Sequence, residues 1–330
     1  MGEKILGLIG VLAAAARFGA PLLFGTTGAI LNEKSGNLNL GVEGTMSVGA
    51  IGGYLMMCYS GSVFIGLSAA FFFAALCGLI YSFLTVSLKA NQNVTGLAMT
   101  IFGVGLCQFV GQTLKSSGKF PAMTPELFSA LAENGIPRLK DIPYIGKLLF
   151  SYNLMVYIAV AVAVVCWVYI AKTRAGLKMR AVGENPAAAD SVGVNVSRVK
   201  YANILVGSGI MGLGGFYMGA VIFSGAWNDT WTSGYGWISV ALVIFASWSP
   251  AKAVFGSFIF GIMIVMQSQI GVLTALFPAA LNWMTQIPLD FYQMLPFLVT
   301  AVILIVNSMR KSKSGNAPAA VGLNYFREER

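Results

Sequence analysis

Nine apolar stretches, most of about 20 residues, constrain this sequence more than any other feature. They cover residues 5–31, 38–59, 63–88, 94–112, 149–171, 201–223, 234–248, 253–273 and 289–307. A helix of about 20 apolar residues crosses the ~30 Å hydrocarbon core of a bilayer. Only 10% of the residues are charged, against about 25% in a soluble domain. The sequence therefore predicts an all-α polytopic membrane protein with about nine transmembrane helices.

Two of these stretches carry signs of irregular structure. The first contains Pro21, which predicts a kink. The seventh, 234–248, is short for a complete span, and we expect it to be re-entrant or broken.

The basic residues predict the orientation. With loop 172–200 and the C-terminal tail placed in the cytoplasm, fourteen Lys and Arg residues lie inside and six outside. Cytoplasmic loops of membrane proteins carry an excess of Lys and Arg. An odd number of spans then puts the N-terminus outside and the C-terminus inside.

This topology divides the chain into a transmembrane domain, 1–307, and a cytoplasmic tail, 308–330. The tail is polar, and we expect it to be mobile. The external loop, 113–148, contains a helix signal: Thr124 suits an N-cap and Pro125 the first helical position. We expect this helix to lie on the membrane surface or to dock a partner.

Several absences narrow the chemistry. The chain has no His, and its four Cys form no Cys-x-x-Cys pair, which argues against a proton relay through imidazole or a metal site. No Gly-x-x-x-x-Gly-Lys-Ser/Thr loop occurs, so we predict that the chain does not hydrolyse ATP itself. We expect no bound cofactor or metal. The net charge of +9 lies in the loops, so we interpret it as topology rather than as nucleic-acid binding.

A carboxylate stands among glycines at the start of the second stretch. If this segment is helical, Asn39, Glu43 and Ser47 form a polar stripe at spacing i, i+4, i+8. A charged residue in a membrane faces protein or a water-filled cavity. Two interpretations stay open: Glu43 clamps free backbone groups at a helix break, or it lines a translocation pathway.

Neutral polar side chains recur in other spans. Asn91, Asn93 and Thr95 open the fourth stretch, Gln108 lies near its far end, and Gln267 lies in the eighth. Amides and hydroxyls suit an uncharged, hydrogen-bonding solute better than an ion. These residues are candidates for a pathway, and hydrogen bonds between helices are the alternative.

Two further patterns predict packing. Small residues dominate 207–219, which is typical of closely packed membrane helices. Trp227, Trp231 and Trp237 cluster in one loop, which we interpret as an aromatic belt at the membrane interface.

The cytoplasmic loop holds the clearest local signal. Asn185 suits an N-cap, Pro186 suits the first helical position, three alanines follow, and Gly193 can end the helix. This predicts a helix of about two turns outside the membrane. Such a helix either docks into a groove on another protein or serves as a connector.

Three motifs together carry a family resemblance. The segments 36–44, 90–98 and 183–189, with the outer loop 136–146, resemble permease subunits of bacterial ABC importers. The most similar group is the nucleoside or simple-sugar branch of the ribose/branched-chain-amino-acid permease family. The resemblance runs from about residue 21 to residue 307 and implies the fold of a type II importer permease. Ribose permeases carry a further N-terminal span and an Asp where Asn39 stands, which argues against ribose.

The resemblance also implies partners. The first is a second permease, which we expect to form a heterodimer with this chain. The others are a cytoplasmic ABC ATPase that binds ATP and Mg, and an external solute-binding protein. The resemblance also implies that the segments of Asn39 and Glu43 and of Asn91 and Thr95 lie beside the pathway. With the polar candidates above, the predicted pathway residues are Asn39, Glu43, Ser47, Asn91, Asn93, Thr95, Gln108 and Gln267. The coupling residues would be Gly183, Glu184, Asn185, Pro186, Ala188 and Asp190.

We therefore expect a multi-pass subunit of the bacterial inner membrane that imports a small, polar, uncharged solute. A nucleoside is the first candidate for this solute. A simple sugar or a branched-chain amino acid is the alternative solute. A self-sufficient secondary transporter or channel is a second class, and the scarcity of acidic residues in the spans argues against it. A membrane enzyme comes third, because no nucleophile–base or metal cluster appears.

Overall fold

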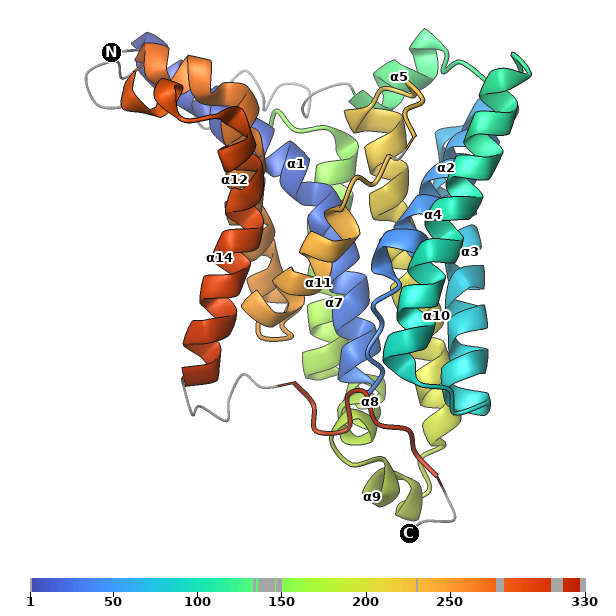
Figure 1. Ribbon diagram of the computed structural model, residues 1–330. Coiled ribbons are helices and arrows are strands. Elements are labelled where there is room, and N and C mark those ends of the chain that lie inside the picture. The colour runs from blue at the N-terminus through green and yellow to red at the C-terminus, as the bar shows by residue number, and fades with distance from the viewer. Residues whose placement is uncertain are drawn as a thin grey trace.

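The fold consists of helices joined by turns and loops. In the computed structural model we describe residues 2–132, 135, 146, 150–229, 231–276, 282–309 and 317–326, and this part of the chain contains no strand. The helices stand roughly side by side as a bundle, with the two ends of the chain at its opposite ends (Figure 1). This confirms the all-α prediction.

Six helical segments are long and apolar enough to cross a membrane. They are α1 (Gly2–Lys34), α3 (Val63–Ser82) with the π-helix η1 (Phe83–Ser87), α4 (Gln92–Ser116), α7 (Leu154–Lys172), α10 (Val196–Tyr217) with the π-helix η2 (Met218–Ile222), and α12 (Pro250–Leu276). The chain is therefore a multi-pass membrane protein.

The three other predicted spans are also helical. They are α2 (Val42–Ser60), α11 (Tyr235–Phe245) and α14 (Leu289–Met309). The 11 residues of α11 measure only about 17 Å, roughly half of a ~30 Å bilayer core. The seventh stretch thus contains a short helix, as its length suggested. The total of nine spans and their orientation stay predictions.

Glycines bring α10 into close contact with its neighbours. A Cβ atom added at Gly215 would lie 1.8 Å from the carbonyl oxygen of Met46, and one at Gly49 would lie 2.4 Å from the Cα of Gly212. No side chain fits at such distances, so backbones approach directly, as in other membrane bundles. This confirms the packing predicted for 207–219.

The two predicted loop helices lie at opposite ends of the bundle. The helix α5 (Pro125–Ala132) lies at the end where the chain begins, and α9 (Pro186–Ser191) lies at the other end (Figure 1). A further helix, α8 (Arg174–Glu184), precedes α9 and was not predicted. Thr124 caps α5, because its hydroxyl accepts the N–H of Leu127 at 3.4 Å. Leu127 and Leu131 are buried in the bundle. Residues 133–134, 136–145 and 147–148 of the external loop, which include most of the motif at 136–146, lie outside the described residues.

One expectation about the tail is wrong. Residues 317–326 pack beneath the bundle against α8, α9 and the start of α4 instead of extending freely (Figure 1). Ala320 is buried, and its N–H donates to the carbonyl of Gly183 at 2.9 Å. The composition of the tail is polar, yet Asn324 and Tyr325 in this described segment find hydrogen-bond partners within the protein.

Candidate translocation groove and coupling end

Glu43 joins α2 to the beginning of α11. Its Oε1 accepts the N–H of Gly234 at 2.9 Å, and its Oε2 accepts the N–H of Gly236 at 2.6 Å. The first N–H groups of a helix lack partners within the helix, and they attract an anion. Glu43 is 6% exposed, so the contact is almost dry. The carboxylate therefore clamps a helix start, although at α11 rather than at its own helix.

Two glycines make this clamp possible. Gly234 has a φ of +88°, which favours glycine. A Cβ atom at Gly236 would lie 2.4 Å from backbone atoms of Glu43. The backbone of α11 can approach α2 this closely only without side chains at the contact.

The predicted polar stripe does not form. The helix α2 begins at Val42, so Asn39 lies before it, and its Oδ1 accepts the N–H of Gly41 at 2.8 Å in a local turn. Ser47 does lie one turn after Glu43, but it is buried and bonded to the hydroxyl of Thr232 at 2.8 Å. The glycines at this point favour a turn, which removes Asn39 from the helical spacing.

The non-helical segment before α2 is held by side chains of two other helices. Gln92 Oε1 accepts the N–H of Leu38 at 2.7 Å. The hydroxyl of Tyr81 donates to the carbonyl of Leu38 at 2.6 Å, and that of Thr100 donates to the carbonyl of Leu40 at 2.9 Å. Non-helical backbone that is buried in a bundle requires such partners. Sequence reasoning left Gln92 out of the candidate residues, since one amide in a run of polar residues gives no periodic signal that it is buried.

A groove of about 680 Å³ opens beside the clamp. It is lined by Glu43, Thr100, Ile101, Val104, Gly105, Gln108, Ser233, Gly234 and Trp237. The side chain of Ile101 is 76% exposed and that of Trp237 is 39% exposed, so the groove is open on one side of the subunit. Of the predicted pathway residues, the structure brings Glu43 and Gln108 together here.

The other predicted pathway residues lie elsewhere. Asn91 is the exposed N-cap of α4 and accepts the N–H groups of Asn93 and Val94. Thr95 is buried, and its hydroxyl donates to the carbonyl of Asn91. Gln267 is half-buried on α12, away from the residues that line the groove.

An aromatic cluster supports the loop between η2 and α11. Trp231 is fully buried, with ring centroids 5.0 Å from Tyr54 and 5.1 Å from Trp227 in edge-on arrangements. Its Nε1 donates to the carbonyl of Ala226 at 2.9 Å. The interpretation of Trp231 as part of an interfacial belt is wrong, because the loop folds inward and buries this ring.

At the other end of the bundle, α9 has the predicted form. The Oδ1 of Asn185 accepts the N–H of Ala188 at 3.0 Å, and Pro186 occupies the first turn. Gly193 follows the helix with a φ of +85°. Ala188 is exposed and Val192 is 79% exposed, so this face of the turn is free in the subunit.

The remaining coupling candidates have contacts within the subunit. Gly183 is buried, and a Cβ atom there would lie 2.2 Å from the carbonyl oxygen of Lys34. Glu184 accepts the N–H of Ala319 at 3.2 Å, and Asp190 accepts the hydroxyl of Tyr325 at 2.9 Å. These three residues therefore join the coupling end to the helix bundle and to the tail.

Comparison with known proteins identifies the family. The family model described as branched-chain amino acid transport system, permease component, matches residues 11–304 of the chain. The chain belongs to this family of ABC transporter permeases. No solved structure matches this permease.

Its curated relatives include transporters of two solute classes. The permease is 32% identical over 335 residues to the guanosine ABC transporter permease NupQ of Bacillus subtilis, with 99% of each chain covered. It is 30% identical over 326 residues to the nucleoside ABC transporter permease NupC of Lactococcus lactis, with 97% of each covered. The glucose ABC transporter permease TsgB13 of Haloferax volcanii is 27% identical over 291 residues, covering 83% of this permease and 72% of TsgB13.

Proposed function

We propose that this permease forms half of a translocation pathway for nucleosides. The groove beside Glu43 is the observation that supports this solute class. Trp237 offers an exposed indole face for stacking with a planar base, and Gln108 offers an amide that can both donate and accept. The relatives that cover nearly the whole chain transport nucleosides or guanosine.

The charge state of the groove also suits a neutral solute. Both oxygens of Glu43 accept backbone N–H groups of the α11 start, so the carboxylate is already hydrogen-bonded within the subunit. The other lining residues are neutral. An anionic solute would meet no positive charge among the lining residues and would face Glu43, whereas an uncharged base and sugar require only apolar and hydrogen-bonding contacts.

The open side of the groove supports pairing with a second permease. Ile101 and Trp237 are exposed along one face of α4 and α11. A second subunit facing this side would complete the pathway, and a heterodimer is the arrangement that we favour. The groove would then open alternately to either side as the helices shift against each other.

ATP hydrolysis belongs to a partner in this scheme. An ABC ATPase carrying ATP and Mg would dock at the exposed face of α9, where Ala188 and Val192 lie. The permease itself would be a transport subunit without an ATPase site. A solute-binding protein would deliver the nucleoside at the opposite end, near α5.

This assignment requires the C-terminal end of the bundle to face the cytoplasm of a bacterial inner membrane, as the basic residues predict. Cysteine labelling in intact cells tests it after replacement of the four native cysteines, of which Cys58 is partly exposed. A single cysteine in α5 should react from outside and one in α9 should not. Labelling at both sites would refute the orientation.

Uptake assays test the solute. A strain lacking the gene should regain uptake of labelled guanosine and adenosine when it carries the wild-type permease. Trp237→Ala should reduce this uptake at least about tenfold through loss of stacking and apolar contact, whereas Trp237→Phe should retain part of it. Rescue of glucose or leucine uptake without nucleoside uptake would overturn the proposal.

A further inference from the structure

The C-terminal clasp, residues 317–326, contacts the coupling end and the translocation helices at the same time. On the coupling side, Tyr325 donates to Asp190 of α9 at 2.9 Å, and Ala319 donates to Glu184 of α8 at 3.2 Å. The ring of Tyr325 packs on the small apolar cluster of Val182, Ala189 and Val196. The clasp is thus bonded to both coupling helices.

On the other side, the clasp forms hydrogen bonds with the turn between η1 and α4. The Nδ2 of Asn324 donates to the carbonyl of Lys89 at 2.6 Å and to that of Ala90 at 3.3 Å. Lys89 has a φ of +57°, a left-handed backbone conformation that is uncommon for a residue with a side chain. Such conformations persist where surrounding contacts hold them, and Asn324 supplies two of these contacts.

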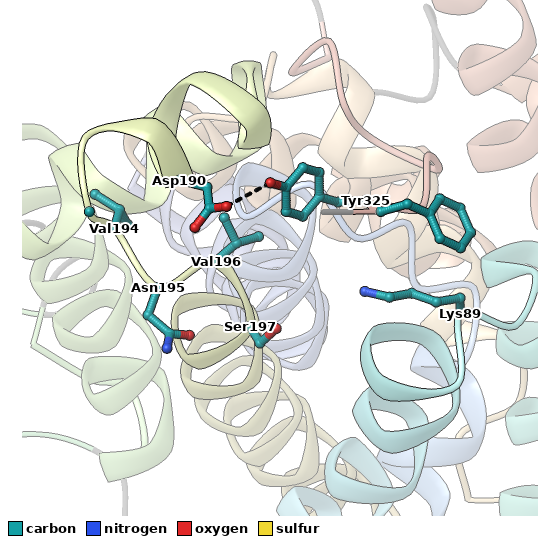
Figure 2. Close-up of a pocket in the computed structure, with 9 residues that line it drawn as sticks. Lys89, Asp190, Val194, Asn195, Val196, Ser197 and Tyr325 are labelled. Carbon is teal, nitrogen blue, oxygen red and sulfur yellow. Dashed lines mark hydrogen bonds between the residues drawn. The ribbon is translucent and has the colours of Figure 1, made fainter. Parts of the chain in front are cut away.

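A hollow of about 500 Å³ separates the two sides that the clasp joins. Asp190 and Val196 line it on one side, and Lys89 lines it on the other (Figure 2). Figure 2 shows the hydroxyl of Tyr325 reaching to Asp190 along the edge of this space. The clasp therefore connects α9 with the turn between η1 and α4 across this hollow.

Gln92 extends the connection to the start of α2. Its Nε2 donates to the carbonyl of Leu323 at 3.2 Å and to the Oδ1 of Asn324 at 3.4 Å. Its Oε1 accepts the N–H of Leu38 at 2.7 Å. Gln92 is 2% exposed, so these bonds compete with little water. One side chain thus binds the clasp and the non-helical segment that precedes Glu43.

We propose that the clasp and Gln92 are positioning elements for coupling, through which movement of α9 reaches the start of α2 and the groove. This rests on the proposed docking of an ATPase at α9. The clasp contacts Asp190 and the buried side of α9, and it leaves Ala188 and Val192 exposed. ATPase docking and clasp contact can therefore occur together, which an autoinhibitory tail would not allow.

The variant Gln92→Glu disturbs the contact of position 92 with the clasp and keeps an acceptor for Leu38. The carboxyl group can still accept the N–H of Leu38, but it repels the oxygens of Leu323 and Asn324 when ionised and offers one O–H in place of two N–H donors when protonated. Tyr325→Phe removes only the hydroxyl that binds Asp190. Leu323→Ala is the matched control in the clasp, because its side chain is 62% exposed and only its carbonyl takes part in the connection.

The first measurement needs no knowledge of the solute. Hydrogen exchange of the segment 36–41 is followed in the complex of permease and ATPase, with and without a non-hydrolysable ATP analogue. In the wild type and in Leu323→Ala, the analogue should change exchange in this segment. In Gln92→Glu and Tyr325→Phe the change should be lost while the ATPase still co-purifies. An equal response in all four proteins would overturn the proposal, whichever solute is carried.

The second measurement separates coupling from assembly. In proteoliposomes with the complete transporter, Gln92→Glu should lower the amount of solute moved per ATP about fivefold or more, with the KM for solute unchanged. A merely structural role would lower uptake and ATP hydrolysis in parallel and leave their ratio unchanged, which would also overturn the proposal. Absence of nucleoside uptake by the wild type would instead contradict the solute assignment alone.

Discussion

Two helix starts in this permease are held in opposite ways. The start of α9 depends on Asn185, whose side chain binds an N–H three residues later. The start of α2, with its preceding turn, depends on Gln92, Tyr81 and Thr100 and on the contact of Glu43 with α11. The partners in these contacts are 43 to 193 residues apart in sequence.

The difference separates a rigid local unit from a junction of several helices. The helix α9 can move as a unit, because its own residues cap it and its outer face is free. The start of α2 can shift only together with α3, α4 and α11, which hold it. A motion that reaches α2 therefore changes the groove, which is lined by residues of α2, α4 and α11 and of the segment just before α11.

Glu43→Leu should have the largest effect. It leaves the N–H groups of Gly234 and Gly236 without an acceptor, and each buried unsatisfied group costs about 1–3 kcal/mol. We expect loss of most uptake and a lower melting temperature of the purified permease. Glu43→Gln keeps one acceptor oxygen and should retain part of the transport. If Glu43→Leu transports like the wild type at equal protein level, the clamp has no functional importance.

Ala188→Arg should abolish coupling without disturbing the bundle. Ala188 is exposed on α9, so the long side chain fits in the free subunit but obstructs a docked partner. We expect normal amounts of permease in the membrane, reduced co-purification of the ATPase and little uptake. Ala188→Ser is the control, since it keeps the small size. Normal uptake by Ala188→Arg would mean that α9 is only a connector.

The same contrast explains what the sequence could predict. The helix α9, the cap at Thr124 and the glycine packing of α10 follow from residues close together in the chain, and each was confirmed. The partner of Glu43 lies 191 and 193 residues away, so no local pattern indicates that it clamps α11. The polar stripe failed at Asn39 because glycines favour a turn there. The docking of the tail was missed because its composition says nothing about the groups that meet it.

Asn185→Ala should have the smallest effect of the three. It removes the side-chain cap of α9 and should cost about 0.5–2 kcal/mol of local helix stability. Hydrogen exchange in residues 186–191 should rise, and uptake should fall severalfold rather than vanish, because α9 still docks for part of the time.

Asn195→Ala provides a matched control for this variant. Asn195 caps α10 in the same manner, through an Oδ1 that accepts the N–H of Arg198 at 2.9 Å. The helix α10 is packed against several neighbours, so its start should tolerate the loss better than the short helix α9. We expect Asn195→Ala to change exchange locally while uptake stays near the wild-type level. Equal losses of uptake in both variants would mean that the cap of α9 has no special part in coupling, and that any loosening at this end of the bundle impairs transport.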